Sequence, residues 1–518
     1  MTCYLYGASV QGIQRFIFES TRLREIAGAS ELVESLCTSC FDEINRGADC
    51  ESIIQAAGNI RIVFHNRDDL ARVTRLFPKV AMDRAPGVTV VQAVVAFTGD
   101  LQKETVDVLE RSLKTASPSV GPEDSWSASA RAPRTGRCAA RLHKDKKNPA
   151  GELQDAATIR KLTAVSQAKL KQKFGMFATD SDFPMEIDDI ADSGNYVAII
   201  HADGNSLGQT LAMLPADEHY SQKWHQFSVK LDEATKAAAQ RAFATHFKDH
   251  ADYQDKKCLP FRPIILGGDD LTVICAASKG IDFTRDFLQA FAEECQLRQD
   301  ALGKALTACA GIAFVKKSYP FYFGVELAEQ LCTQAKKVAK ASLAASAPVP
   351  SCLMFHRELS SFVEDSFDRM CLRELNANGL SFAFGPYQVD GSPALPALDM
   401  LLTGCKAISS AKADGEEKGH NPLRSGLREY QSEVHNNTDA ANFLVDRLES
   451  ISGEANPGAL SRLKKALAAL VGKAPDAALR ELVVCERGGQ SYSPVNDLLM
   501  ASSFWKAPTG AQQREGGL

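Results

Sequence analysis

Residues 264–275 read IILGGDDLTVIC, the pattern from which the fold can be predicted. Two short runs rich in β-branched residues flank a turn of two glycines and two aspartates, a pattern typical of a β-hairpin. Residues 53–64 read IIQAAGNIRIVF and repeat it, with apolar residues at matching positions and small residues in the turn. Such internal similarity predicts that one structural unit occurs twice in the chain.

The residues around each hairpin predict the same order of elements. The first copy is expected to have strands at 4–10, 52–55, 60–64 and 88–97, with helical segments at 13–44 and 69–82. The second copy is expected to have strands at 196–202, 261–266, 271–276 and 306–315, with helices at 224–247, 283–297 and 325–345. Both orders are βαββαβ, the ferredoxin-like unit. We therefore predict an α+β protein with two palm domains, the second similar to a GGDEF or nucleotide-cyclase domain.

The chain of 518 residues exceeds what one hydrophobic core usually organises, so several compact units are expected. The predicted units are a first palm (1–115), a linker or insert (116–190), a second palm (191–350), an irregular connecting segment (351–430), a helical C-terminal domain (431–506) and a disordered tail (507–518). The insert carries a basic stretch from Arg131 to Arg137 that continues to Lys147. A solvated loop is the favoured interpretation of that charge, and a contact with a phosphate backbone is the alternative.

Composition narrows the class of protein. A hydrophobic content of 45%, a charged content of 24% and a net charge of −5 are typical of a globular protein and argue against a surface that binds polyanions everywhere. We find no long apolar run and no signal peptide, so we expect a cytoplasmic protein without membrane contact. The 14 cysteines have no disulfide framework, and the one C-x-x-C pair, Cys37 and Cys40, lies in a helical pattern.

Three aspartates form the candidate catalytic set. Asp203 follows the strand expected at 196–202, and Asp269 and Asp270 lie in the hairpin between the next two strands. These positions meet at one end of a palm sheet, where carboxylates can hold two divalent cations, Mg²⁺ or Mn²⁺, for phosphoryl transfer. We therefore predict Asp203, Asp269 and Asp270 as catalytic residues and metal ligands, with Gly204 as a further metal ligand.

Glycines and one lysine around these acids suit a nucleotide triphosphate. Glycines in the turn let phosphates approach the backbone. Glycines after Asp203 leave backbone N–H groups at a helix start accessible to phosphate. A lysine on the last helix can meet phosphate as a cation, although a solvated helix face explains it equally well. The predicted nucleotide-binding residues are Gly204, Asn205, Ser206, Gly208, Gly267, Gly268 and Lys336.

A plain turn is the alternative explanation of the GGDD motif, since Asp and Gly are common in turns for local reasons. Two observations favour chemistry. Asp203 stands at the correct preceding strand end, and the first copy builds the same turn with Gly58 and Asn59 instead of aspartates. We find no His-Asp pair, Walker A motif, nucleophile elbow or HExxH motif that would indicate a rival chemistry.

At these motifs the sequence resembles the large polymerase subunit of type III CRISPR effector complexes, the Cas ten family, and more distantly the GGDEF nucleotide cyclases. The stretches that carry the resemblance are GIQRFIF (12–18), LREIAGASEL (23–32), ADGNSLG (202–208), GGDD (267–270), TACAGIA (307–313) and Ala335-Lys336. The resemblance implies synthesis of cyclic or linear oligonucleotide messengers, usually oligoadenylates, from ATP with release of pyrophosphate. It also implies a non-catalytic first palm and a role in antiviral defence.

The sequence departs from that family in two places. We expect no HD nuclease domain before the first palm, so DNA cleavage is not predicted, and no paired-cysteine zinc module is visible between the palms. Expected partners are ATP or another NTP, together with RNA, CRISPR-type effector subunits or a second copy of the chain. The alternative function is a non-enzymatic scaffold that binds nucleotide or RNA within a CRISPR-like effector complex.

Overall fold

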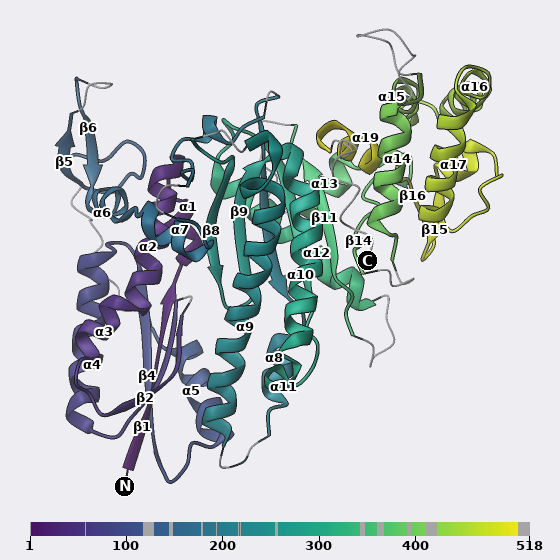
Figure 1. Ribbon diagram of the computed structural model, residues 1–518. Coiled ribbons are helices and arrows are strands. Elements are labelled where there is room, and N and C mark those ends of the chain that lie inside the picture. Colours follow the sequence, from purple (N-terminus) through teal and green to yellow (C-terminus); the bar gives the residue numbers. More distant parts are fainter. Residues whose placement is uncertain are drawn as a thin grey trace.

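The computed structural model describes residues 2–56, 58–117, 129–144, 149–177, 180–192, 194–215, 217, 219–253, 257–341, 348–359, 367–390, 395–410 and 422–505. The tail predicted at 507–518 and Lys147 lie outside these described residues. Figure 1 shows the two palms side by side, with a small insert above the first palm and a helical region beyond the second.

The first palm has the predicted βαββαβ order. Its elements are β1 (Thr2–Gln11), α1 (Ile13–Phe18), α2 (Leu23–Cys37), α3 (Ser39–Asn45), β2 (Cys50–Ala56), β3 (Asn59–Phe64), α4 (Arg67–Arg84), β4 (Thr89–Thr98) and α5 (Lys103–Thr115). The antiparallel sheet has the order β2-β3-β1-β4, which confirms the ferredoxin-like fold. The single helical segment expected at 13–44 is three helices, broken at residues 19–22 and at Thr38, whose backbone is not helical.

The second palm repeats this order and extends the sheet. Its elements are β7 (Tyr196–Gly204), α8 (Leu207–Ala212), α9 (Tyr220–Phe243), β8 (Phe261–Gly267), β9 (Asp270–Ala276), α10 (Gly280–Leu297), α11 (Gln299–Leu302), β10 (Ala308–Lys316) and α12 (Phe321–Ala341). The sheet order is β14-β11-β10-β7-β9-β8, and the four strands β10-β7-β9-β8 match the first palm. Strands β11 (Cys352–Arg357) and β14 (Tyr387–Gln388) come from the segment that we expected to be irregular. The run CLMFHR is buried and has no alternating pattern, so the sequence did not reveal it as a strand.

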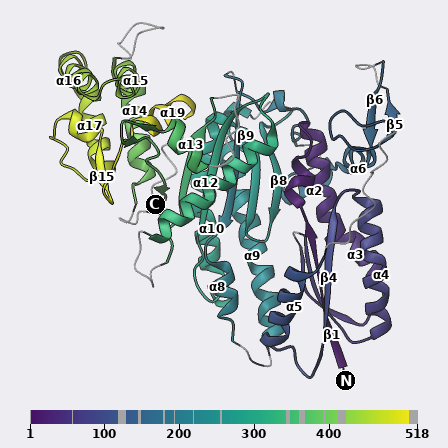
Figure 2. The ribbon, with the colours of Figure 1, turned by 180° about the vertical axis from the view of Figure 1, so that it is seen from behind.

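The two palms share their cores. Figures 1 and 2 show α9 and α10 covering one face of the second sheet. On the other face α12 packs, and the apolar cluster there includes Ile199 and Leu331 of the second palm and Ile26 of the first. In return, Tyr220 and Trp224 of α9 pack with the α5 side of the first palm. Each palm therefore buries apolar surface of the other.

The insert contains β5 (Ala139–His143), β6 (Glu152–Asp155), α6 (Ala156–Ala164) and α7 (Gln167–Lys173). Its basic stretch folds back on the first palm. Arg134 forms ion pairs with Glu25 and Glu152, and Arg137 Nε donates to Glu19 Oε1 at 2.9 Å. These two guanidinium groups are therefore neither a solvated loop nor a free phosphate site, because carboxylates of the protein already pair with them.

The C-terminal region is helical and returns to the second palm. Helices were predicted only from residue 431, whereas three of the helices below begin within 351–430, the segment expected to be irregular. It contains α13 (Phe367–Glu374), α14 (Leu398–Ser410), α15 (Pro422–Val434), α16 (Thr438–Ala455), α17 (Pro457–Val471), α18 (Leu479–Leu482) and α19 (Val495–Phe504), with the short strands β12 (Asn376–Ala377), β13 (Leu380–Ser381), β15 (Cys485–Arg487) and β16 (Gln490–Tyr492). Phe504 stacks on Phe314 of β10 with 4.3 Å between ring centroids. The Trp505 indole donates a hydrogen bond to Asp282 Oδ1 of α10 at 2.9 Å.

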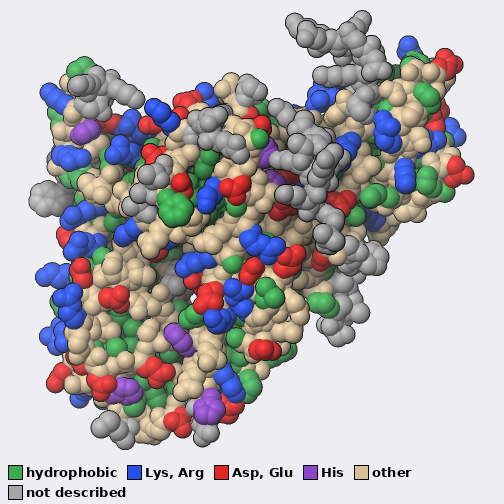
Figure 3. All heavy atoms as spheres, in the orientation of Figure 1, with side chains coloured by type: hydrophobic (Ala, Val, Ile, Leu, Met, Phe, Trp, Pro, Cys, Tyr) green, Lys and Arg blue, Asp and Glu red, His purple; other side chains and the backbone are tan. Residues whose placement is uncertain are grey.

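The surface agrees with the modest net charge. On the face in Figure 3 acidic and basic side chains are mixed, and Lys and Arg are most frequent at the left edge, over α4 and the insert. Among the described helices, none has the length and apolar character needed to cross a membrane.

Candidate active site

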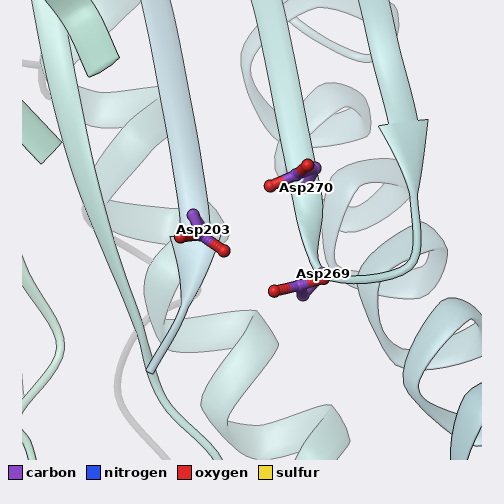
Figure 4. A group of neighbouring side chains, drawn as sticks. All are labelled: Asp203, Asp269 and Asp270. Atoms are coloured by element: carbon purple, nitrogen blue, oxygen red, sulfur yellow. The ribbon is translucent and has the colours of Figure 1, made fainter. Parts of the chain in front are cut away.

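The hairpin register brings the three predicted aspartates together. Strand β7 pairs with β9 so that Ala202 lies opposite Leu271, which sets Asp203 beside Asp270 at the end of the strand. Gly267 pairs with Asp270 and closes a turn whose second residue is Asp269. One carboxylate oxygen from each aspartate lies within 4.8 Å of the others. Figure 4 shows Asp203 on one strand facing the two turn acids on its neighbour.

The turn is tied to helix α9. Gly268 has a φ of 64°, a value that favours glycine. Its N–H donates to Asp232 Oδ1 at 3.2 Å, and its carbonyl accepts a hydrogen bond from Thr235 Oγ1 at 2.6 Å. Asp232 and Thr235 were not found from the sequence, because polar residues are common on an amphipathic helix. They fix the position of the backbone that carries Asp269.

Gly204 is required by a close approach. A Cβ atom at this position would lie 2.5 Å from Leu207 Cδ1 and 3.1 Å from Asp269 Cβ. Lys336 reaches the same point from α12, where its ammonium pairs with the Asp203 carboxylate and donates to the Gly204 carbonyl at 2.8 Å. Lys336 therefore belongs to the acid cluster and not to a solvated helix face, and its contact with phosphate stays a prediction.

The remaining predicted residues lie around this end of β7. Asn205 is buried and turned inward, where its Nδ2 donates to Thr307 Oγ1 at 2.9 Å. Ser206 has a φ of 59° and precedes α8, and Gly208 is exposed in the first turn of that helix. Gly267 is held in the hairpin. Thus Gly208 borders open space, whereas Asn205 supports the strand end.

The acids strongly affect one another's protonation. Burial raises the pKa of Asp269, and its hydrogen bond with Asp203 and the nearby Asp270 raise it further. Burial opposes ionisation of Asp203 as well, but the hydrogen bond from Asp269 and the Lys336 cation hold the pKa of Asp203 below its usual value. Burial and Asp203 raise the pKa of Asp270 to about 6, against the effect of Lys336. Such a crowded set of oxygen donors fits a hard divalent cation, which removes the repulsion.

A further carboxylate lies at the edge of this cluster. Glu329, seven residues before Lys336 on α12, has its pKa raised to about 7 by burial and by Asp270 and Glu326. Its Oε1 accepts a hydrogen bond at 2.5 Å from Gln14 Nε2, which belongs to α1 of the first palm. Glu329 and Gln14 carry no motif of their own, so the sequence did not single them out. They connect the two palms beside the acids.

The first palm has the same geometry without the acids. Register places Ser9 opposite Asn59, as Asp203 stands beside Asp270 in the second palm. Ser9 Oγ donates to Asn59 Oδ1 at 3.1 Å, and Gly12 has a φ of 66°, close to that of Ser206. Neutral polar groups thus occupy the positions of two of the three carboxylates.

Comparisons with known proteins concern the second palm and the fold. Residues 196–344 match the protein family described as Cas10/Cmr2, second palm domain. Among solved structures, the Csm1–Csm4 cassette in complex with AMPPNP is similar with a TM-score of 0.50 and 11% identity, covering 96% of this chain and 70% of that chain. The apo Csm1–Csm4 cassette gives a TM-score of 0.50 and 12% identity with the same coverage.

Csm1 from T. onnurineus gives a TM-score of 0.48 and 12% identity, covering 96% of this chain and 69% of that chain. A comparison with curated proteins finds no match. At these identities the likeness to solved structures concerns the fold.

Proposed function

Since this chain is Cas10-like, we propose that it is a nucleotidyltransferase that converts ATP or other NTPs into cyclic or linear oligonucleotides and releases pyrophosphate. The observation that carries the proposal is the cluster of Asp203, Asp269 and Asp270, whose oxygens lie within 4.8 Å on two neighbouring strands. An acid-free copy of the same hairpin in the first palm supports it. The hairpin does not need aspartates to fold, so their presence in the second palm calls for a chemical reason.

We assign the three aspartates, with the Gly204 carbonyl, to holding two divalent cations. When bound, Mg²⁺ or Mn²⁺ would activate the attacking hydroxyl and stabilise the leaving pyrophosphate. The protein supplies position and charge. Asp232 and Thr235 anchor the turn to α9, so the carboxylates are held in place before substrate arrives.

Lys336 pairs with Asp203 and keeps that carboxylate ionised, which prepares it to act as a ligand. Nucleotide binding is assigned to the space beside the turn and the start of α8. A Cβ atom on Gly208 or Gly268 would meet nothing within 4 Å, so phosphates can approach the backbone at both. We propose that Ser206, Gly204 and Gly267 shape the backbone that faces the nucleotide. Asn205 supports this backbone from the protein interior. Gln14 and Glu329 lie at the edge of the acid cluster that faces the first palm. We propose that they contact the acceptor nucleotide.

The proposed partners follow from this assignment. ATP is the first substrate to test, in line with the AMPPNP complex of the cassette that shares the fold. That structure also pairs Csm1 with Csm4, so a CRISPR-type effector subunit is a proposed partner, and RNA and a second copy of the chain are others. All 14 cysteines are free thiols, which supports work in the reducing cytoplasm.

The decisive experiment incubates the purified chain with labelled ATP and Mn²⁺ and measures pyrophosphate release. We expect release by the wild type and none by the double variant Asp269→Ala, Asp270→Ala, because the metal ligands are lost. A matched control replaces one exposed aspartate of the first palm and one on α16, Asp100→Ala and Asp439→Ala, and should keep wild-type activity. Equal release by all three proteins, or none by any, would reject the proposal. ATP binding without release would favour the non-enzymatic scaffold instead.

A further inference from the structure

Both hairpins of the duplicated unit contain a β-bulge at the same position. In the first palm the register skips between Ser52 and Ile54, which leaves Ile53 without a partner on β3. In the second palm it skips between Pro263 and Ile265, which leaves Ile264 unpaired. Each bulged residue stands six residues before the one that closes its hairpin turn, Asn59 or Asp270. A bulge bends its strand and re-aims the residues that follow it.

A helix of the opposite palm donates a hydrogen bond to each bulge. The Ile264 carbonyl accepts from the Ser30 hydroxyl of α2, in the first palm. The Ile53 carbonyl accepts at 3.0 Å from His225 Nδ1 of α9, in the second palm. Because a carbonyl can only accept, His225 must carry a proton on Nδ1. Helices α2 and α9 are the same element of the duplicated unit, so the two contacts are equivalent and reciprocal.

The Ser30 and His225 contacts differ in the turn that follows the strand they bind. The strand held by Ser30 runs directly into the turn that carries Asp269 and Asp270, whereas the strand held by His225 runs into the acid-free turn at Gly58. Ile264 has no partner in the strand register. Without the Ser30 hydroxyl, the carbonyl of this buried residue would lose a hydrogen bond. Ile264 is 3% exposed, so without Ser30 its carbonyl would depend on a water in the small cavity that Ser30 and Ile264 both border.

We propose that Ser30 of the first palm is a positioning residue for the second palm. Its hydrogen bond to the Ile264 carbonyl fixes the position of the GGDD hairpin. The first palm would then contribute to the reaction through this contact as well as at the edge of the site. This inference rests on the proposed nucleotidyltransferase activity for its effect on rate. Its effect on the hairpin itself does not depend on that activity.

Hydrogen–deuterium exchange of the full chain tests the hairpin directly. For Ser30→Ala we expect amides of residues 265–272 to exchange about fivefold faster, the factor that corresponds to one hydrogen bond, while residues 54–61 stay protected. For the matched control His225→Ala we expect the reverse pattern. Unchanged exchange at 265–272 in Ser30→Ala would overturn the inference, as would both hairpins loosening alike in both variants, since that indicates only general destabilisation.

Pyrophosphate release then tests the consequence for the reaction. Ser30→Ala should lower the rate about tenfold or more, because small displacements of catalytic groups are costly, and His225→Ala should keep the wild-type rate. Ser30→Thr should restore it, because it keeps the hydroxyl and Ser30 borders a small cavity with Ala27 and Arg262 that can take the extra methyl group.

Equal rates for Ser30→Ala and His225→Ala, or no rescue by Ser30→Thr, would contradict the positioning role. If the wild type itself releases no pyrophosphate, the proposed function fails, whereas the exchange pattern still decides whether Ser30 fixes the hairpin.

Discussion

At the residue scale, the unusual feature of the site is a single lysine among three acids. Lys336 is mostly buried and bonds to Asp203 and the Gly204 carbonyl. Its charge lowers the pKa of both Asp203 and Asp270, in opposition to burial. Because metal binding requires ionised carboxylates, Lys336 extends the pH range in which the site can take a cation, although its charge also repels that cation.

This balance predicts the pH dependence of metal binding. A carboxyl with a raised pKa keeps its proton to a higher pH, so Mn²⁺ affinity of the wild type should rise as pH increases through about 6, where Asp270 ionises. Lys336→Ala removes the cation and should move this rise to higher pH. Lys337→Ala is the matched control, since Lys337 is exposed on the same helix. Titration with Mn²⁺ at several pH values measures the effect, and identical profiles for the two variants would contradict the role of Lys336.

The same residues show how far the sequence could predict the site. Asp203, Asp269 and Asp270 could be placed together because each stands at a strand end or in a turn, and strand order fixes where such positions meet. The inward turn of Asn205, the bond from Asp232 to Gly268 and the donor role of Ser30 depend on how separate elements pack. No local pattern of residues encodes those contacts, so they appear only in the folded chain.

At the element scale, the hairpin is held by α9, which underlies its turn. Thr235 is fully buried, and its one hydroxyl proton has two acceptors within reach, the Gly268 carbonyl at 2.6 Å and the Leu231 carbonyl of its own helix at 3.0 Å. Thr284 of α10 is equally buried, and among the described residues its hydroxyl donates to the Gly280 carbonyl of its own helix at 2.7 Å. The two threonines therefore differ mainly in the bond to the GGDD turn.

Replacing each threonine by valine separates that bond from general packing. We expect Thr235→Val and Thr284→Val each to lower the free energy of unfolding by about 1 kcal/mol, the usual value of a hydrogen bond. Only Thr235→Val should also weaken Mn²⁺ binding and pyrophosphate release, since it frees the turn. Denaturant unfolding and Mn²⁺ titration of both variants measure this. A loss of metal affinity in both, or in neither, would argue against α9 as the anchor.

Element prediction succeeded where a pattern is local and failed where context decides. The hairpins at 53–64 and 264–275 were found because two short β-rich runs that flank a turn of small residues are a sufficient signal. Strand β11 was missed because it is buried between β10 and β14 and lacks alternation. The prediction that the basic stretch is solvated was wrong for Arg134 and Arg137, because their partners Glu25 and Glu19 lie more than 100 residues earlier in the chain.

At the scale of the whole molecule, the duplication gives two palms with the same fold that differ in the side chains at the hairpin turn. Both keep the bulge, the tight turn and the helix that contacts the other palm, since these features build the shared interface. Only the second palm keeps acids at the turn, while the first has Ser9 and Asn59 in two of their positions. Both palms therefore share the interface, whereas the proposed chemistry belongs to the second palm alone, with the first palm contacting it through α1 and α2.

The stability of the second palm also depends on the C-terminal region, because its last helix, α19, packs into the core of that palm. Phe504→Ala removes a ring that is 8% exposed and stacked on Phe314, and should lower the free energy of unfolding by about 3 kcal/mol. Phe443→Ala on α16, where the side chain is 67% exposed, should change it by less than about 0.5 kcal/mol. Guanidinium unfolding followed by circular dichroism and tryptophan fluorescence measures both. A helical region that folds independently would instead give two transitions, with the palm transition unmoved by Phe504→Ala.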